Sequence, residues 1–123
     1  MNIKKFLFST AKTKIGSYMV GETFEKFSKI LPVDRVYEND YVIAFWHPKP
    51  FWEKHILIVP KKKIKNMISI VDSNQKFYLE VFKAVKSIIE KLKWSEYSLL
   101  SNGGERQEVN QLHFHLCTGK ELK

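Results

Sequence analysis

The sequence predicts an α+β fold, in which one long helix covers one face of a five-stranded, mainly antiparallel sheet. From Phe77 to Leu92, apolar residues recur every three or four positions and charged residues fill the opposite side, which is the pattern of an amphipathic helix. Runs of β-branched and aromatic residues, bounded by turn residues, lie on both sides of this segment and indicate strands. These runs are Val33 to Glu38, Tyr41 to Trp46, His55 to Val59, Tyr97 to Ser101 and Val109 to Cys117.

The first 23 residues are predicted to form a basic, helical N-terminal extension. No acidic residue occurs before Glu22, and the apolar residues from Ile15 to Leu31 have roughly helical spacing. The apolar run at residues 6–8 is too short for the core of a signal peptide or for a membrane span. Two interpretations are open: an extra helix packed on the domain, or a basic element that binds anionic membrane or nucleic acid.

The first two strands are predicted to form a hairpin, because only Asn39 and Asp40 separate them. Residues 47–50 must form a loop, because two prolines in this short segment break any strand ladder. The third strand is a continuous apolar run that ends at Pro60, which favours a central strand buried on both faces. Asp72 and Gln75 stand at the spacing of a capping box before the long helix.

The last predicted strand contains the candidate reactive side chains. If its side chains alternate, one face holds the apolar side chains of Leu112, Phe114 and Leu116. The other face then holds the polar side chains of Gln111, His113 and His115. Because the long helix needs the apolar face, we expect the polar face to be open to solvent. Imidazoles there can act as nucleophile, base or acid near neutral pH.

Composition limits the partners. A chain of 123 residues fits one domain, and its net charge of +8 predicts an anionic partner: a nucleotide, a nucleic acid or a membrane surface. The two arginines, Arg35 and Arg106, are too few for base reading by arginine. The single cysteine, Cys117, excludes an intramolecular disulfide and suits a reducing compartment, so we expect a cytoplasmic protein, with peripheral membrane association through the N-terminus left open.

Two stretches of the chain resemble the histidine triad (HIT) family. Gly103 to Leu116 resembles its glycine-rich turn, Gln-x-Val and triad, in a variant with Gln111 at the first position, Gln-x-His-x-His. Leu31 to Lys62 resembles its N-terminal hairpin and central strand. The resemblance covers about residues 24 to 119 and implies that residues 24–123 form a HIT-like nucleotide-binding domain.

The resemblance implies a homodimeric hydrolase or nucleotidyltransferase that acts on a nucleoside phosphate derivative of the phosphoramidate or dinucleotide type. His113 would be the nucleophile that forms a covalent nucleotidyl-histidine, His115 would contact phosphate or act as an acid, and Gln111 would orient its neighbour. His55 would support the site from behind. The expected substrate-binding residues are Asn102, Gln107, Val109, Phe45 and His47. No cofactor, metal or dedicated protein partner is implied.

Three departures from the family pattern bear on activity. Gln111 can hydrogen-bond but cannot share a proton, so we expect turnover weakened by about one to two orders of magnitude. Glu108 would repel phosphate if it pointed inward, and His47 replaces the aspartate that commonly holds the ribose hydroxyls. A nucleotide-binding module with weakened catalysis therefore stays open, as does a basic protein that binds membrane or RNA.

Zinc is a further alternative at this strand. His113, His115 and Cys117 would project from one face, and zinc accepts nitrogen and sulfur ligands. Successive positions on a flat strand converge poorly on one tetrahedral ion, so no metal is expected there.

Overall fold

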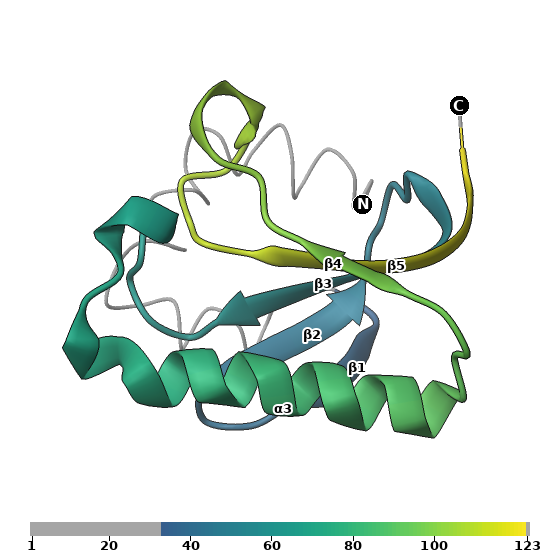
Figure 1. Cartoon of the computed structure of the whole chain (residues 1–123), viewed down its shortest axis with the longest axis horizontal. Coiled ribbons are helices and arrows are strands. Elements are labelled where there is room, and N and C mark those ends of the chain that lie inside the picture. Colours follow the sequence, from purple (N-terminus) through teal and green to yellow (C-terminus); the bar gives the residue numbers. More distant parts are fainter. Residues whose placement is uncertain (1–32, 123) are drawn as a thin grey trace.

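The computed structural model describes residues 33–122 and shows one antiparallel sheet with one long helix packed on it (Figure 1). The strand order is β1-β2-β3-β5-β4, and every neighbouring pair is antiparallel. The strands are β1 (Arg35–Glu38), β2 (Val42–Trp46), β3 (Trp52–Pro60), β4 (Ser98–Leu100) and β5 (Phe114–Glu121). The predicted fold class is thereby confirmed for this part of the chain. The N-terminal extension, residues 1–23, and its predicted helix lie outside the described residues.

Helix α3 (Gln75–Leu92) covers one face of the sheet, and the two form the main hydrophobic core. The buried members of this core are Val42, Ala44, Ile56, Ile58, Val81, Ala84, Val85, Ile88 and Leu116. Burying each of the larger side chains stabilises the fold by about 1.5–3 kcal/mol, so the apolar stripe of α3 is a core face. Lys93 caps the end of the helix, and its left-handed backbone (φ 56°) lets the next residue, Trp94, donate its N–H to the carbonyl of Ile89 at 3.2 Å.

The predicted capping box is wrong. Asp72 opens a short 3-10 turn (Asp72–Asn74), and this turn moves the start of α3 to Gln75. Gln75 is therefore the first residue of the helix, two positions too early to reach back in a capping box. Asn74 stands at the cap and makes no side-chain capping hydrogen bond.

The β1–β2 hairpin is closed by Asn39, as its sequence predicted. The side-chain oxygen of Asn39 accepts the N–H groups of Tyr41 and Val42, and its amide donates to Glu80 Oε1 at 2.8 Å. One residue therefore shapes the turn and joins it to α3.

The last strand begins later than predicted. β5 pairs with β3 from Phe114 opposite Ile58, and residues 109–113 are irregular. If the pairing extended two positions before Phe114, Leu112 would lie opposite Pro60 of β3. Proline has no N–H group, so it cannot donate the hydrogen bond that would continue the ladder. Leu112 donates its N–H to the carbonyl of Ile64 instead. The predicted alternation of side chains therefore fails at Gln111.

The face of the sheet opposite α3 is buried, which corrects the prediction of an open face. His55 is 1% exposed, and His47 and His115 are each 5% exposed. Their rings, with those of Phe51 and Trp52, pack against one another with neighbouring centroids 4.3–5.5 Å apart. Aromatic packing thus fills the space that the sequence assigned to solvent. Among residues 33–122, no helix has the length and apolar character that crossing a membrane requires.

Candidate active site

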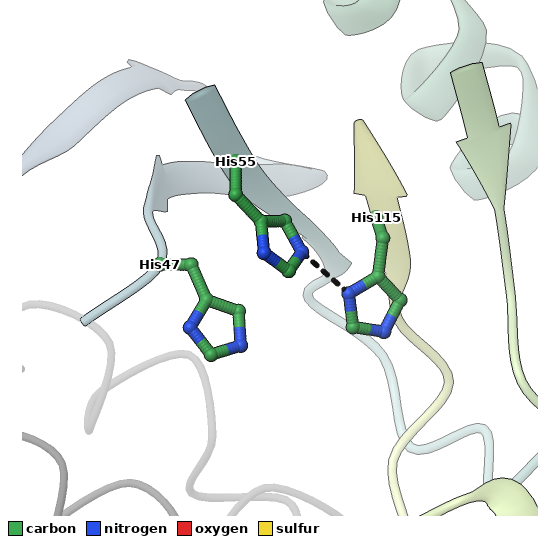
Figure 2. Close-up of side chains that lie close together, drawn as sticks. All are labelled: His47, His55 and His115. Atoms are coloured by element: carbon green, nitrogen blue, oxygen red, sulfur yellow. Dashed lines mark hydrogen bonds between the residues drawn. The ribbon is translucent and has the colours of Figure 1, made fainter. Parts of the chain in front are cut away.

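Three adjacent strands bring three buried histidines together (Figure 2). His47 follows the end of β2, His55 lies on β3 and His115 on β5, and these strands are neighbours in the sheet. The N–H of His47 donates to the carbonyl of His55 at 2.8 Å, which fixes their backbones side by side. We call His47, His55 and His115 the histidine cluster.

The hydrogen bonds of His55 and His115 determine where their protons lie. The backbone N–H of Phe51 donates to His55 Nδ1 at 3.0 Å, so Nδ1 is an acceptor and the ring proton is on Nε2. His55 Nε2 lies 2.8 Å from His115 Nδ1 and donates to it. The proton of neutral His115 is therefore on its Nε2, which is buried and has no hydrogen-bond partner among the described residues.

The two other site histidines are fixed in the same way by backbone groups. The N–H of Lys49 donates to His47 Nδ1 at 3.0 Å, which places the ring proton of His47 on Nε2. His113 Nδ1 lies 2.7 Å from the carbonyl oxygen of Gln111, which can only accept, so Nδ1 carries the proton. The Nε2 lone pair of His113 is consequently available for attack on an electrophile.

All four rings are held neutral at pH 7. Burial, together with the other imidazoles nearby, lowers the pKa of His47 and of His115 to about 3, and burial lowers the pKa of His55 to about 4. Burial also lowers the pKa of His113, although its hydrogen bond to Gln111 and the charge of Glu108 oppose the shift. A neutral His113 is the form that a nucleophile requires.

A small pocket opens beside His113. The described residues that line it are His47, Phe51, Asn102, Arg106, Glu108, Val109, His113 and His115. It combines the lone pair on His113 Nε2 with the N–H donor at His115 Nε2 and the guanidinium of Arg106. Such a pocket suits an electrophilic group that carries negatively charged oxygens.

Five of the eight residues predicted to contact the reaction or the substrate line this pocket, and three lie elsewhere. Phe45 is 1% exposed within the sheet and does not line the pocket. The amide of Gln107 donates to the carbonyls of Lys65 and Val109, so it holds the loop around the pocket. The eighth, Gln111, is fully buried.

The side chain of Gln111 holds the end of β3 and makes no hydrogen bond to His113. Its amide donates to the carbonyls of Pro60 at 3.1 Å and Lys62 at 2.7 Å. Only the backbone carbonyl of Gln111 orients His113, and any residue would supply that group.

Sequence reasoning missed Arg106 and Phe51 as residues of the site. Arg106 stands in the glycine-rich turn, next to Gln107, and its charge was a signal for phosphate binding. Phe51 contributes a ring to the pocket and its backbone N–H to His55, and no side-chain pattern reveals the second role.

The histidine cluster has the spacing of a metal site, since its ligand nitrogens lie within 4.8 Å of one another. Its hydrogen bonds do not fit one. A metal-bound histidine normally donates its second ring N–H to an acceptor. Here Nδ1 of His47 and Nδ1 of His55 accept backbone N–H groups, so the nitrogens that face the cluster carry protons. The arrangement favours hydrogen-bond donation over metal binding.

The predicted alternative zinc set also finds no support. The thiol of Cys117 donates to the carbonyl of Ser98 at 3.8 Å, and burial raises its pKa. A thiol held protonated in this way is a poor zinc ligand.

Comparison with known proteins decides the family. The HIT domain family model matches residues 28–122. The chain belongs to the HIT domain family. An uncharacterised HIT-like protein from Buchnera aphidicola subsp. Baizongia pistaciae is 33% identical over 112 residues, which cover 85% of this chain and 97% of that protein. One from Methanocaldococcus jannaschii is 32% identical over 88 residues, covering 70% of this chain and 68% of that one.

Solved structures share the fold of this HIT domain. A histidine triad protein from Clostridium difficile superposes with a TM-score of 0.71 and 31% identity, covering 81% of this chain and 91% of that one. A HIT family hydrolase from Clostridium thermocellum gives a TM-score of 0.71 and 32% identity, covering 80% and 90%. The antiparallel sheet with its long helix is therefore the HIT fold.

Proposed function

We propose that this HIT domain protein is a nucleotide hydrolase or nucleotidyltransferase that works through a covalent nucleotidyl-His113 intermediate. The observation that carries the proposal is the pair of fixed imidazoles in the pocket. His113 presents a lone pair on Nε2, and His115 presents a proton on Nε2. The description of a similar protein from Clostridium thermocellum as a HIT family hydrolase supports the reaction class.

In the proposed reaction, His113 Nε2 attacks the phosphorus atom that carries the nucleoside. The bond from phosphorus to the leaving group breaks, and its electron pair departs with the leaving group. The ring of His113 becomes positively charged, and its Nδ1–H bond to the Gln111 carbonyl strengthens as that charge develops. Water, or another acceptor, then displaces the nucleotidyl group from His113.

The charged residues of the pocket act on the phosphate in opposite directions. Arg106 can hold two phosphate oxygens at once through its planar guanidinium. Glu108 lines the same pocket and disfavours an anion near it, so it is expected to limit affinity. The net charge of +8 attracts anionic substrates over a longer range.

The structure supports an active enzyme over a binding module. The weakened turnover expected from Gln111 assumed that its side chain takes part in the site. Because that side chain bonds Pro60 and Lys62, and the backbone orients His113, the nucleophile is complete without a histidine at position 111.

We also propose a homodimer in the cytoplasm. Among residues 33–122, strand β4 is an edge strand with one neighbour, and α3 leaves large apolar side chains exposed, with Leu79 at 50% and Phe82 at 57%. A two-fold axis beside β4 would cover both features in a second copy. Sedimentation of the wild type and of Phe82→Glu tests this; a wild type that stays monomeric at high concentration would contradict it.

Mass spectrometry of the intact protein tests the reaction. The protein is incubated briefly with an adenosine phosphoramidate or a dinucleotide, quenched at neutral to alkaline pH, and compared with His113→Ala. An adduct of one nucleotidyl mass on the wild type alone is the expected result. Absence of an adduct with every purine and pyrimidine substrate, despite measurable nucleotide binding, would favour a binding module instead.

A further inference from the structure

We propose that the turn after β3 docks on an anionic lipid surface, where Met67 and Ile68 enter the headgroup region and the lysines beside them contact lipid phosphates. We call residues 61–71 the basic turn. It has no acidic residue, and its lysines are Lys61, Lys62, Lys63 and Lys65. Docking of this kind goes beyond the proposed reaction and does not depend on it.

The tip of the basic turn presents apolar side chains to solvent. Ile68 is 94% exposed, Val71 is 54% exposed and Met67 is 49% exposed. The basic turn lies at the edge of the molecule, between β3 and the start of α3 (Figure 1). A single exposed apolar residue is ordinary on a protein surface, but three within five positions of one turn indicate a partner that accepts apolar side chains.

Hydrogen bonds hold the tip in this exposed arrangement. Asn66 Oδ1 accepts the N–H of Ser69 at 3.0 Å and the hydroxyl of Ser69 at 2.9 Å, which closes a 3-10 turn over Met67–Ser69. After the tip, the hydroxyl of Tyr78 donates to the carbonyl of Val71 at 3.0 Å. Because the turn is already ordered, binding through it costs little conformational entropy.

The base of the basic turn is joined to the segment that precedes His113. Ile64 is 2% exposed, and its carbonyl accepts the N–H of Leu112 at 2.7 Å. The carbonyl of Lys65 accepts the side-chain amide of Gln107 at 2.7 Å. The basic turn is therefore a fixed part of the domain, attached to the same segment that lines the active-site pocket.

The lysines beside the tip provide the charge that an anionic surface attracts. Lys61 pairs with Glu38 at 2.7 Å, so it is already neutralised within the fold. The lysines that remain for docking are all exposed, and they are Lys62, Lys63 and Lys65. A lysine close to an anionic membrane surface strengthens binding by about fivefold, so three of them give a substantial attraction.

An open groove beside the tip has the polar groups that a lipid phosphate requires. Its volume is about 460 Å³, and the residues that line it are Lys63, Lys65, Ser69 and Asn110. Ammonium, hydroxyl and amide groups all donate hydrogen bonds to phosphate oxygens, and the ammonium groups also balance the charge of the phosphate. The groove therefore suits the phosphodiester headgroup of an anionic lipid.

The composition of the basic turn favours lipid over nucleic acid. Surfaces that bind single-stranded nucleic acid combine positive charge with aromatic rings on which the bases stack. The basic turn contains neither an aromatic residue nor an arginine. Aliphatic side chains flanked by lysines are typical of interfacial membrane binding, in which apolar insertion and attraction to anionic lipid act together.

Co-sedimentation of the full chain with lipid vesicles tests the docking. We expect binding to vesicles of equal parts phosphatidylglycerol and phosphatidylcholine, and none to phosphatidylcholine alone. Ile68→Asp should weaken the binding by about tenfold or more, because it removes the inserted side chain. Leu122→Asp is the matched control, since Leu122 is 44% exposed just beyond β5, and it should bind like the wild type. Equal binding by Ile68→Asp and the wild type would overturn the proposal.

A pair of double variants separates a docking face from the attraction of net charge. Lys63→Gln combined with Lys65→Gln should weaken vesicle binding by about 25-fold. The matched control is Lys91→Gln combined with Lys93→Gln, which removes the same charge at the far end of α3, about 27 Å from its start. The control should bind almost as tightly as the wild type. Equal losses in the two double variants would contradict a docking face on the basic turn.

A fluorophore at the tip reports which segment meets the lipid. The single native cysteine, Cys117, is buried, so a thiol-reactive dye labels an introduced cysteine selectively. In Ile68→Cys, the emission of a polarity-sensitive dye should move to shorter wavelength on anionic vesicles, and in Leu122→Cys it should stay unchanged. Vesicle binding without a shift at position 68 would place the contact in another segment and overturn the proposal. A shift with single-stranded RNA, or with rising protein concentration, but not with vesicles would overturn it in favour of nucleic acid or a second copy.

Discussion

Replacement of Gln111 by alanine should destabilise the fold while leaving the chemistry of His113 intact. The side chain is fully buried, and its amide bonds the carbonyls of Pro60 and Lys62. Each of these hydrogen bonds contributes about 1 kcal/mol, and the one lost methylene group contributes about 0.8 kcal/mol. The side-chain oxygen is buried without a hydrogen-bond partner among the described residues, so removing it returns about 1 kcal/mol. The net loss in the free energy of unfolding is about 2 kcal/mol.

Urea unfolding measures this loss. With a slope of about 1–1.5 kcal/mol per molar urea, the unfolding midpoint should fall by about 1–2 M. Gln111→Met is the matched control, because it keeps the volume of the side chain and removes only the hydrogen bonds. It should lose less stability than the alanine variant.

Single-turnover adduct formation gives the second readout for this prediction. Because the backbone carbonyl of Gln111 is unchanged in Gln111→Ala, the folded variant should label His113 at close to the wild-type rate. A variant that keeps its stability but loses the adduct would refute the reasoning, since it would show that the side chain takes part in the reaction.

Three further predictions follow from the described contacts. The histidine cluster binds fewer protons in the folded state than in the unfolded state, because its pKa values are lowered from 6.5 to about 3–4. The free energy of unfolding should therefore be highest above pH 6.5 and fall as the pH is lowered toward 4. Urea unfolding midpoints measured across this range check the trend. Arg106→Gln should weaken nucleotide binding by about 10-fold to 100-fold in titration calorimetry, with the unfolding midpoint unchanged; equal affinity would remove Arg106 from the phosphate site. Asn39→Ala removes the acceptor of the Tyr41 and Val42 N–H groups and should lower stability by about 1–2 kcal/mol, whereas a loss of activity in the folded variant would count against its purely structural role.

The fold could be predicted from the sequence because its signals are local. The period of the apolar residues in α3 and the turn at Asn39 depend on neighbours within a few positions. The strand limits were less accurate, and the largest error came at the start of β5. There the pairing with β3 ends because the next partner of β5 would be Pro60, opposite Leu112. Predicting this end requires the register of two strands that are far apart in the sequence.

The candidate site could be predicted only in part. His113 and His115 were found by their pattern, and both line the pocket. The burial of the histidine cluster was missed, because it results from rings that three separate strands bring together. The positions of the ring protons were also out of reach, since they depend on hydrogen bonds from a loop.

The loop between β2 and β3 has a consequence for mutagenesis. Its peptide groups at Lys49 and Phe51 set the protonation of His47 and His55, and every amino acid except proline brings the same N–H group. Alanine scanning would therefore pass over this role at both positions, because alanine preserves the donor. Substitution of the amide by an ester at position 51, through chemical synthesis or an expanded genetic code, would remove the donor and release the tautomer of His55. The chemistry of this pocket therefore depends partly on backbone N–H groups, which no substitution among the standard amino acids other than proline removes.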